Sequence, residues 1–158
     1  YDIRPRDWSF RRVLFRSMYI HNNRGSRTVS LMYIDLDRFK EVNDTYGHKV
    51  GDAVLVHTAD VLRQLFRDDF VARLGGDEFL VVRLGRCCVD QLEQEAEAFL
   101  KEMKTAFMAA EQTVSLSASV GIAQSSDSMV DIDALLQRSD QALYQAKKAG
   151  RSRYCVYR

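Results

Sequence analysis

The sequence predicts an α+β domain with a four-stranded, largely antiparallel sheet and helices packed on one face of it. The first observation is the order of its periodic segments: strand, helix, hairpin, helix, strand, helix and a short edge strand. The second is a pair of glycines, Gly75 and Gly76, between two apolar runs, because adjacent glycines form the tight turn of a hairpin. The first six elements match a ferredoxin-like layout.

Bulk composition favours one compact domain and argues against several classes of partner. A chain of 158 residues with 46% hydrophobic composition can bury a core of its own. The charges balance at 23 Lys and Arg against 22 Asp and Glu, so we expect no nucleic-acid partner. No apolar run is long enough to span a membrane, although a longer parent protein could be anchored elsewhere. Three cysteines without metal-site spacing indicate reduced thiols in a cytoplasmic protein.

Residues 1–17 differ from the rest of the chain. They have no helical or strand period, and their arginines cluster around aromatic residues. Their ending, RVLFRS at 12–17, resembles the conceptual translation of a sequencing-library adapter. We therefore expect an artefact or a disordered segment at 1–17, and a single domain with a truncated N-terminus at 18–158. A basic, aromatic arm for nucleic acid or a membrane surface is the alternative.

The first strand is predicted at residues 28–36, an apolar run that ends in acids. Asp35 lies at its carboxyl end, and Asp37 follows it and is expected to support the loop rather than bind a metal. Residues 37–48 indicate a loop or short helix, whose backbone amides and Lys40 could bind phosphate. The next helix is predicted to open at Gly51 and Asp52.

The hairpin at residues 70–84 carries two adjacent carboxylates at its tip, Asp77 and Glu78. Neighbouring acids repel each other, so the pair is easiest to understand if a cation binds there. An exposed acidic turn is the alternative. In a ferredoxin-like sheet the end of the first strand lies beside this tip, so Asp35, Asp77 and Glu78 are expected to converge. A few oxygen ligands with room for water and phosphate suit Mg²⁺.

The remaining segments complete the predicted fold. Residues 89–109 have the spacing of an amphipathic helix. Residues 113–123 alternate between apolar residues and serines, which predicts a strand with one solvated face. A capping-box spacing at 128–131 starts a third helix, which ends in basic residues and a glycine at 147–150. Residues 154–157 could form an edge strand.

Four of these segments together resemble the GGDEF family, the bacterial diguanylate cyclases. They are YIDLDRFKEVNDTYGHKVGD, RLGGDEF, SASVGIA and SDQALYQAKKAGRSR, in order and at compatible spacings within residues 28–158. The resemblance implies a fold related to nucleotidyl cyclases and polymerase palms. It also implies that a homodimer condenses two GTP into cyclic di-GMP and pyrophosphate, by phosphoryl transfer with two Mg²⁺ or Mn²⁺ per active site.

The resemblance also implies roles for individual residues. Asp35 and Asp77, with the backbone carbonyl of Leu36, match the metal ligands of the family. Either Asp77 or Glu78 would help to deprotonate the attacking 3′-hydroxyl, and the sequence does not distinguish them. The guanine-binding pair is matched by Asn43 and Asp52. The phosphate-binding positions are matched by Arg38, Phe39, Lys40, Lys147 and Arg151.

Simpler readings remain for some of these residues. Asp52 could be a helix N-cap, and Lys147 and Arg151 could only complement a helix dipole. A non-catalytic domain that binds GTP or a partner protein is the alternative function. Another palm-type transferase acting on nucleic acid is disfavoured by the balanced charge.

The chain departs from the family pattern in three ways. The helix with an Asp-x-Leu-Thr…Asn-Arg motif that usually begins the domain is missing or replaced, and no upstream sensor domain is present. Many members also carry an inhibitory product site, Arg-x-x-Asp, before the glycines. Here Asp69 is in place but Phe66 occupies the arginine position, and phenylalanine cannot replace a bidentate contact to phosphate. We therefore expect weak or no feedback inhibition.

Overall fold

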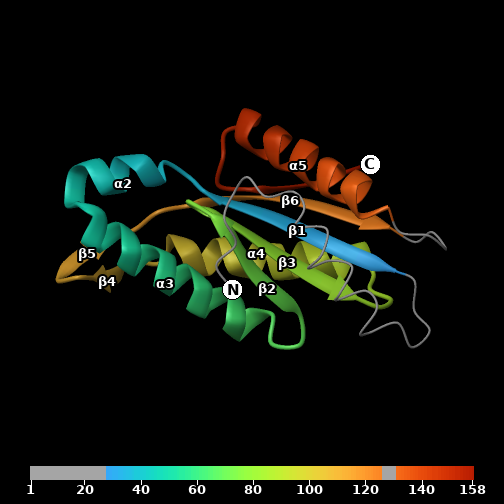
Figure 1. Cartoon of the computed structure of the whole chain (residues 1–158), viewed down its shortest axis with the longest axis horizontal. Helices are drawn as coiled ribbons and strands as arrows, with labels where there is room; N and C mark the ends of the chain where they lie inside the picture. Colours follow the sequence, from blue (N-terminus) through green and yellow to red (C-terminus); the bar gives the residue numbers. More distant parts are fainter. Residues whose placement is uncertain (1–27, 126–130) are drawn as a thin grey trace.

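The computed structural model describes residues 28–125 and 131–158, whose main sheet has the strand order β2-β3-β1-β6-β7 (Figure 1). All neighbours in it are antiparallel except β6 and β7, which are parallel. The predicted α+β fold with a mainly antiparallel sheet is confirmed. The strands are β1 (Val29–Leu36), β2 (Phe70–Gly75), β3 (Glu78–Leu84), β6 (Ala118–Ser125) and β7 (Tyr154–Val156).

Helices cover both faces of this sheet, so the prediction of one covered face is wrong. Helices α3 (His48–Leu65) and α4 (Val89–Lys104) pack on the face that contains Met32 and Ile34. Helix α5 (Ile132–Lys148) packs on the other face, with Leu31 and Tyr33 (Figure 1). Each β1 residue is buried, as expected for a central strand between two layers.

Small residues in β6 allow the close approach of α5. A Cβ built on Gly121 would lie 2.1 Å from the backbone oxygen of Ser139 in α5. The neighbouring Ser119 is completely buried. The serines of the segment 113–123 were predicted to face solvent, which is wrong for Ser119, and Gly121 makes room for a helix.

The chain between α4 and β6 also differs from the prediction. Helix α4 ends at Lys104 rather than at 109, and Phe107–Ala109 (β4) and Gln112–Val114 (β5) form a separate hairpin. The strand predicted over 113–123 is therefore interrupted between β5 and β6. The hydroxyl of Ser115 donates to the carbonyl oxygen of Lys104, which ties this interruption to the end of α4.

Helix α2 (Phe39–Tyr46) follows β1 and packs against α3. None of its residues is buried, so the side of α2 that faces away from α3 is exposed to solvent. Gly47, with φ of 88°, turns the chain directly into α3, which begins at His48, three residues before the predicted start.

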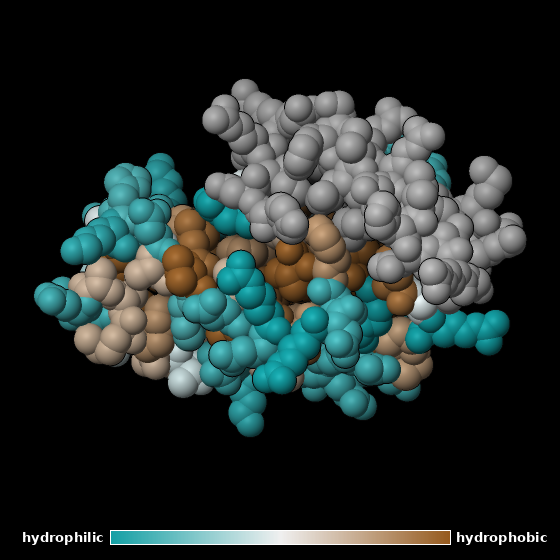
Figure 2. All heavy atoms as spheres, turned by 60° about the horizontal axis from the view of Figure 1, so that its bottom comes forward, coloured by the Kyte–Doolittle hydropathy of each residue, from teal (hydrophilic) through white to brown (hydrophobic). Residues whose placement is uncertain are grey.

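The predictions for residues 1–17, and the cap predicted at Ser128, lie outside the described residues. Asp131 caps α5 by accepting a hydrogen bond from the amide of Ala134. Within 28–125 and 131–158, no helix is long and apolar enough to cross a membrane. On the face drawn in Figure 2, hydrophobic residues gather near the middle, and hydrophilic residues surround them along the lower edge.

Candidate functional site

The carboxyl end of β1 lies against the tip of the β2–β3 hairpin. Asp35 lies opposite Glu78 in the strand register, and the amide of Leu36 donates to the carbonyl oxygen of Asp77 at 3.2 Å. Gly75 and Gly76 take φ values of 121° and 54°, which suit glycine at a tight turn. The guanidinium of Arg73 donates two hydrogen bonds, of 3.0 and 2.8 Å, to the Gly76 carbonyl.

Two carboxylates share this site with one cation. Burial, together with the hydrogen bond and the charge of the neighbouring Asp35, raises the pKa of Asp77 from 3.8 to about 7. The ammonium of Lys147, in the last turn of α5, forms an ion pair with Oδ2 of Asp35. Lys147 was predicted to contact phosphate, and its partner in this structure is the carboxylate instead.

The third predicted carboxylate lies next to this pair without completing a triad. Oε2 of Glu78 accepts a hydrogen bond of 3.3 Å from the hydroxyl of Tyr33. Across the described ranges, no group of three acidic, His or Cys side chains is arranged to hold a metal ion. The convergence is therefore found for Asp35 and Asp77.

The donor set suits a hard divalent cation with most of its coordination left to other ligands. Asp35 and Asp77 supply carboxylate oxygens, and the carbonyl of Leu36 is beside them. Burial is the main cause of the raised pKa of Asp77, and the hydrogen bond and charge of Asp35 add to it. A cation bound between them would stabilise both in the ionised form, so the residues present fit Mg²⁺ or Mn²⁺.

The segment after β1 presents backbone amides beside these acids. Arg38 has φ of 56° and is the N-cap of α2, without a side-chain hydrogen bond to the helix. The first amides of a helix, here those of Phe39 and Lys40, lack partners within the helix and favour anions. This arrangement is consistent with the predicted phosphate contacts.

The predicted guanine-binding residues come from α2 and α3, which pack side by side. A Cβ on Gly51 would lie 1.8 Å from Oδ1 of Asn43, so the Asn43 carboxamide lies directly on Gly51. Asp52 is the next residue, and its side chain is exposed. Because Gly47 is the N-cap of α3, Asp52 lies within the helix, and the alternative role as N-cap is wrong.

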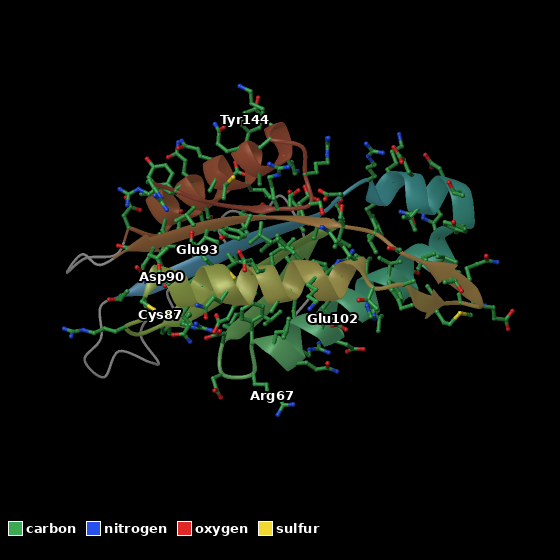
Figure 3. All side chains as sticks on the ribbon, turned by 180° about the vertical axis from the view of Figure 1, so that it is seen from behind. Arg67, Cys87, Asp90, Glu93, Glu102 and Tyr144 are labelled. Atoms are coloured by element: carbon green, nitrogen blue, oxygen red, sulfur yellow. The ribbon has the colours of Figure 1, made fainter. Side chains whose placement is uncertain are left out.

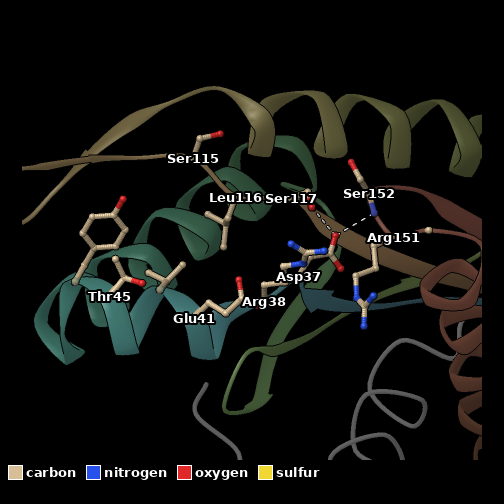
Figure 4. A pocket seen from close by; sticks show the side chains of 12 residues that line it. Asp37, Arg38, Glu41, Thr45, Ser115, Leu116, Ser117, Arg151 and Ser152 are labelled. Atoms are coloured by element: carbon tan, nitrogen blue, oxygen red, sulfur yellow. Dashed lines mark hydrogen bonds between the residues drawn. The ribbon is translucent and has the colours of Figure 1, made fainter.

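Arg151 follows α5 and lines a cavity of about 430 Å³ (Figure 4). This cavity lies between α2, the segment 115–117 and the loop 150–152. Arg38 and Arg151 line it, whereas Asn43 and Asp52 do not. It therefore adjoins the predicted nucleotide site at the phosphate-binding arginines only.

The region of the predicted degenerate product site contains an ion-pair network. Phe66 is 2% exposed, and the side chain of Arg67 points away from the sheet (Figure 3). The guanidinium of Arg83 bonds both oxygens of Asp69, with Nε to Oδ1 at 2.9 Å, and lies 2.8 Å from Glu95. Sequence analysis missed this network, although an arginine inside the apolar run of β3 was a signal of a buried partner.

Comparison with known proteins gives consistent matches along most of the chain. The family model described as "Diguanylate cyclase, GGDEF domain" matches residues 9–153, a range that begins inside the segment 1–17. Diguanylate cyclase DosC of Escherichia coli K12 is 37% identical over 144 residues, which cover 89% of this chain and 31% of DosC. Cyclic di-GMP phosphodiesterase PdeR of the same strain is 39% identical over 137 residues, or 86% of this chain and 21% of PdeR. The chain thus spans a minor part of these relatives.

Solved structures show the same fold. The GGDEF domain of TpbB (or YfiN) from Pseudomonas aeruginosa has a TM-score of 0.83 at 33% identity, covering 99% of this chain and 90% of that one. The active GGEEF domain of a Vibrio cholerae diguanylate cyclase has a TM-score of 0.76 at 32% identity, with coverages of 95% and 92%.

Proposed function

This chain belongs to the GGDEF-domain family of diguanylate cyclases, and from that membership we propose that it condenses two GTP into cyclic di-GMP and pyrophosphate. The observation that carries the proposal is the Asp35–Asp77 pair, with the pKa of Asp77 raised to about 7. Such a pair has little structural use, because it places like charges together. It is useful where a divalent cation and a triphosphate bind.

Asp35, Asp77 and the Leu36 carbonyl would hold Mg²⁺ or Mn²⁺, two per active site, together with the substrate phosphates. The bound ions would neutralise charge on the attacking and leaving oxygens. A 3′-hydroxyl attacks the α-phosphorus of the other GTP, loses its proton, and pyrophosphate leaves. Asp77 and the adjacent Glu78 are the two candidate bases for that proton, because both carboxylates lie at the hairpin tip.

Substrate recognition is assigned to the two helices beside the acids. Asn43 and Asp52 would pair with the N1–H and N2–H₂ donors of guanine, which adenine does not offer. The amides of Arg38 and Phe39 would bind the triphosphate with Lys40, Lys147 and Arg151. Lys147 would move from Asp35 to phosphate, since a metal ion would take over the neutralisation of that carboxylate.

A homodimer is required by the chemistry of the product. Cyclic di-GMP has two equivalent phosphodiester bonds, so two GTP must face each other about a two-fold axis. Each protomer would hold one GTP. An additional sensor domain, in a longer cytoplasmic or membrane-anchored protein, would control this pairing. We expect little inhibition by cyclic di-GMP, because Phe66 is buried and Asp69 is already bound by Arg83.

A second function is favoured by one observation: PdeR, 39% identical, is named a phosphodiesterase. In that case this domain would bind GTP or a partner protein without turnover. Fusing the chain to a dimerising coiled coil and incubating it with GTP and Mg²⁺ separates the two functions. Cyclic di-GMP in the product supports a cyclase, and GTP binding without product supports the second function. Absence of both product and GTP binding contradicts the cyclase and leaves only the binding of a partner protein.

A further inference from the structure

Asp37 is a buried carboxylate close to the site but outside the residues assigned to metal or substrate. Asp37 is 7% exposed. Oδ1 accepts a hydrogen bond from the hydroxyl of Ser119 at 2.7 Å. Oδ2 accepts two, from the hydroxyl of Ser117 at 2.6 Å and from the backbone amide of Ser152 at 3.0 Å (Figure 4). Both oxygens are therefore occupied by protein donors, which leaves Asp37 poorly suited to bind a metal ion.

These three donors come from segments far away in the sequence. Ser117 and Ser119 are 80 and 82 residues from Asp37, on either side of the first residue of β6. Ser152 is 115 residues away, in the loop after α5. One carboxylate thus joins the end of β1 to the start of β6 and to the loop that carries Arg151.

The loop after α5 has a backbone conformation that needs such a partner. Arg151 and Ser152 have φ values of 61° and 51°, and the left-handed region is unfavourable for residues other than glycine. The amide of Arg151 donates to the Ala146 carbonyl at 3.1 Å, and its own carbonyl accepts from Nε of Arg153 at 3.0 Å. The bond from Ser152 to Asp37 fixes the next peptide group, so Arg151 is held on both sides.

We propose that Asp37 is a positioning residue, which holds the loop 150–152 so that Arg151 is directed at the triphosphate. The inference rests on the proposed function, because it takes phosphate as the ligand of Arg151. Arg151 lies with Arg38 on the wall of the same cavity, close to the amides at the start of α2. A guanidinium must be oriented to form a bidentate contact with phosphate, so freedom in this loop lowers affinity for phosphate and leaves guanine recognition intact.

The substitution Asp37→Asn tests this proposal with little change in volume. A carboxamide has one acceptor oxygen, and its NH₂ group would face one of the three donors. We expect the affinity for GTP, measured by equilibrium binding, to fall about tenfold, with the affinity for GMP changed less than about twofold. The same loss is expected for Arg151→Ala, and the double variant should lose no more than either single variant, because residues that act through one contact are not additive.

Thr58→Val is the matched control, because Thr58 is also a buried polar residue, and its hydroxyl donates to the Val54 carbonyl within α3. It should lose stability without changing the ratio of GTP to GMP affinity. Equal losses for GTP and GMP in Asp37→Asn, or additive losses in the double variant, would overturn the proposal.

Hydrogen exchange at the Ser152 amide separates this inference from the proposed function. Asp37→Asn should accelerate exchange there and not at the amides of β1. If the wild-type chain binds no GTP, the proposed function fails on its own. Faster exchange would then still support the tether between Asp37 and the loop, and unchanged exchange would overturn it.

Discussion

Two clusters in this domain have the same composition, two carboxylates and one basic side chain, and different consequences. At the end of β1, the ammonium of Lys147 pairs with Asp35, and Asp77 is the second carboxylate beside them. Between β2, β3 and α4, Asp69 and Glu95 share the guanidinium of Arg83. Each cluster has one base for its two acids, and the two bases differ in geometry.

The guanidinium of Arg83 reaches both of its carboxylates, and its pKa is raised mainly by the hydrogen bonds to Asp69. Lysine offers a single point of charge, and the ammonium of Lys147 pairs with Asp35. Asp77 is partly buried beside a like charge, and burial together with Asp35 raises its pKa to about 7. Arg83 pairs with both acids of its cluster, which is therefore structural. Lys147 pairs with Asp35 and leaves Asp77 available for a metal ion and a substrate.

The largest expected effect is on activity and comes from removing Asp77, the acid with which Lys147 does not pair. Asp77→Ala should reduce formation of cyclic di-GMP from GTP to less than about a hundredth of the wild-type rate, because a metal ligand and candidate base is lost. Product is measured by chromatography, with circular dichroism to verify the fold. Asp69→Asn is the matched change in the other cluster and should retain most of the rate. Equal losses in the two variants would contradict the distinction between the clusters.

The second effect is on stability, in the structural cluster. Arg83→Ala leaves two partly buried carboxylates without their cation and should lower the free energy of unfolding by about 3 kcal/mol. Urea unfolding measures it. Arg83→Lys retains the charge but not the fork, so we expect a smaller loss. If Arg83→Lys were as stable as the wild type, the bidentate geometry of the guanidinium would contribute nothing to stability.

The reciprocal substitution sharpens the comparison at the site. Lys147→Arg introduces a fork that can reach both Asp35 and Asp77, so it should compete with a divalent cation. We expect the affinity for Mg²⁺ to fall about tenfold, measured by titration of the nucleotide-free chain. Lys148→Arg, one residue later on the exposed side of α5, is the control and should leave the affinity unchanged.

The smallest effect is the pH dependence of stability without divalent cations. The pKa of Asp77 is raised from 3.8 to about 7 in the folded state, so the folded chain holds a proton that the unfolded chain releases. The free energy of unfolding should therefore fall as pH rises from about 4 to about 7. Urea unfolding in EDTA across this range should show a weaker decline for Asp77→Asn. Parallel curves for the two proteins would show that Asp77 has an ordinary pKa.

The first strand, the hairpin and its acidic tip could be predicted because their signals are local. The apolar run of β1 and the glycine pair before Asp77 define a strand and a turn without reference to other segments. The extension of α4 to residue 109 was an error of the same local method, because Phe107 continues the helical spacing although it begins β4. The alternation in 113–123 was misread, because small residues on one face of a strand can lie against a closely packed helix as well as face solvent.

Much of the site depends on partners that a local pattern cannot identify. The bonds from Ser117 and Ser119 to Asp37, and from Arg83 to Asp69, join distant segments. The pairing of Lys147 with Asp35 follows from α5 covering the second face of the sheet, which was not predicted. The contact of Asn43 with Gly51 depends on the packing of two helices.

The bond between Asp37 and Ser152 also has a consequence for the order of folding. It closes a loop of 115 residues, and the central strand β1 needs β6, from much later in the chain, to complete its pairing. Contacts of such separation form late and slowly. During synthesis, β1 and the hairpin can emerge and associate long before the residues around Arg151 are available. Under the proposed function, the nucleotide site would be complete only after the residues around Arg151 have been made, so affinity for GTP would report completion of this domain.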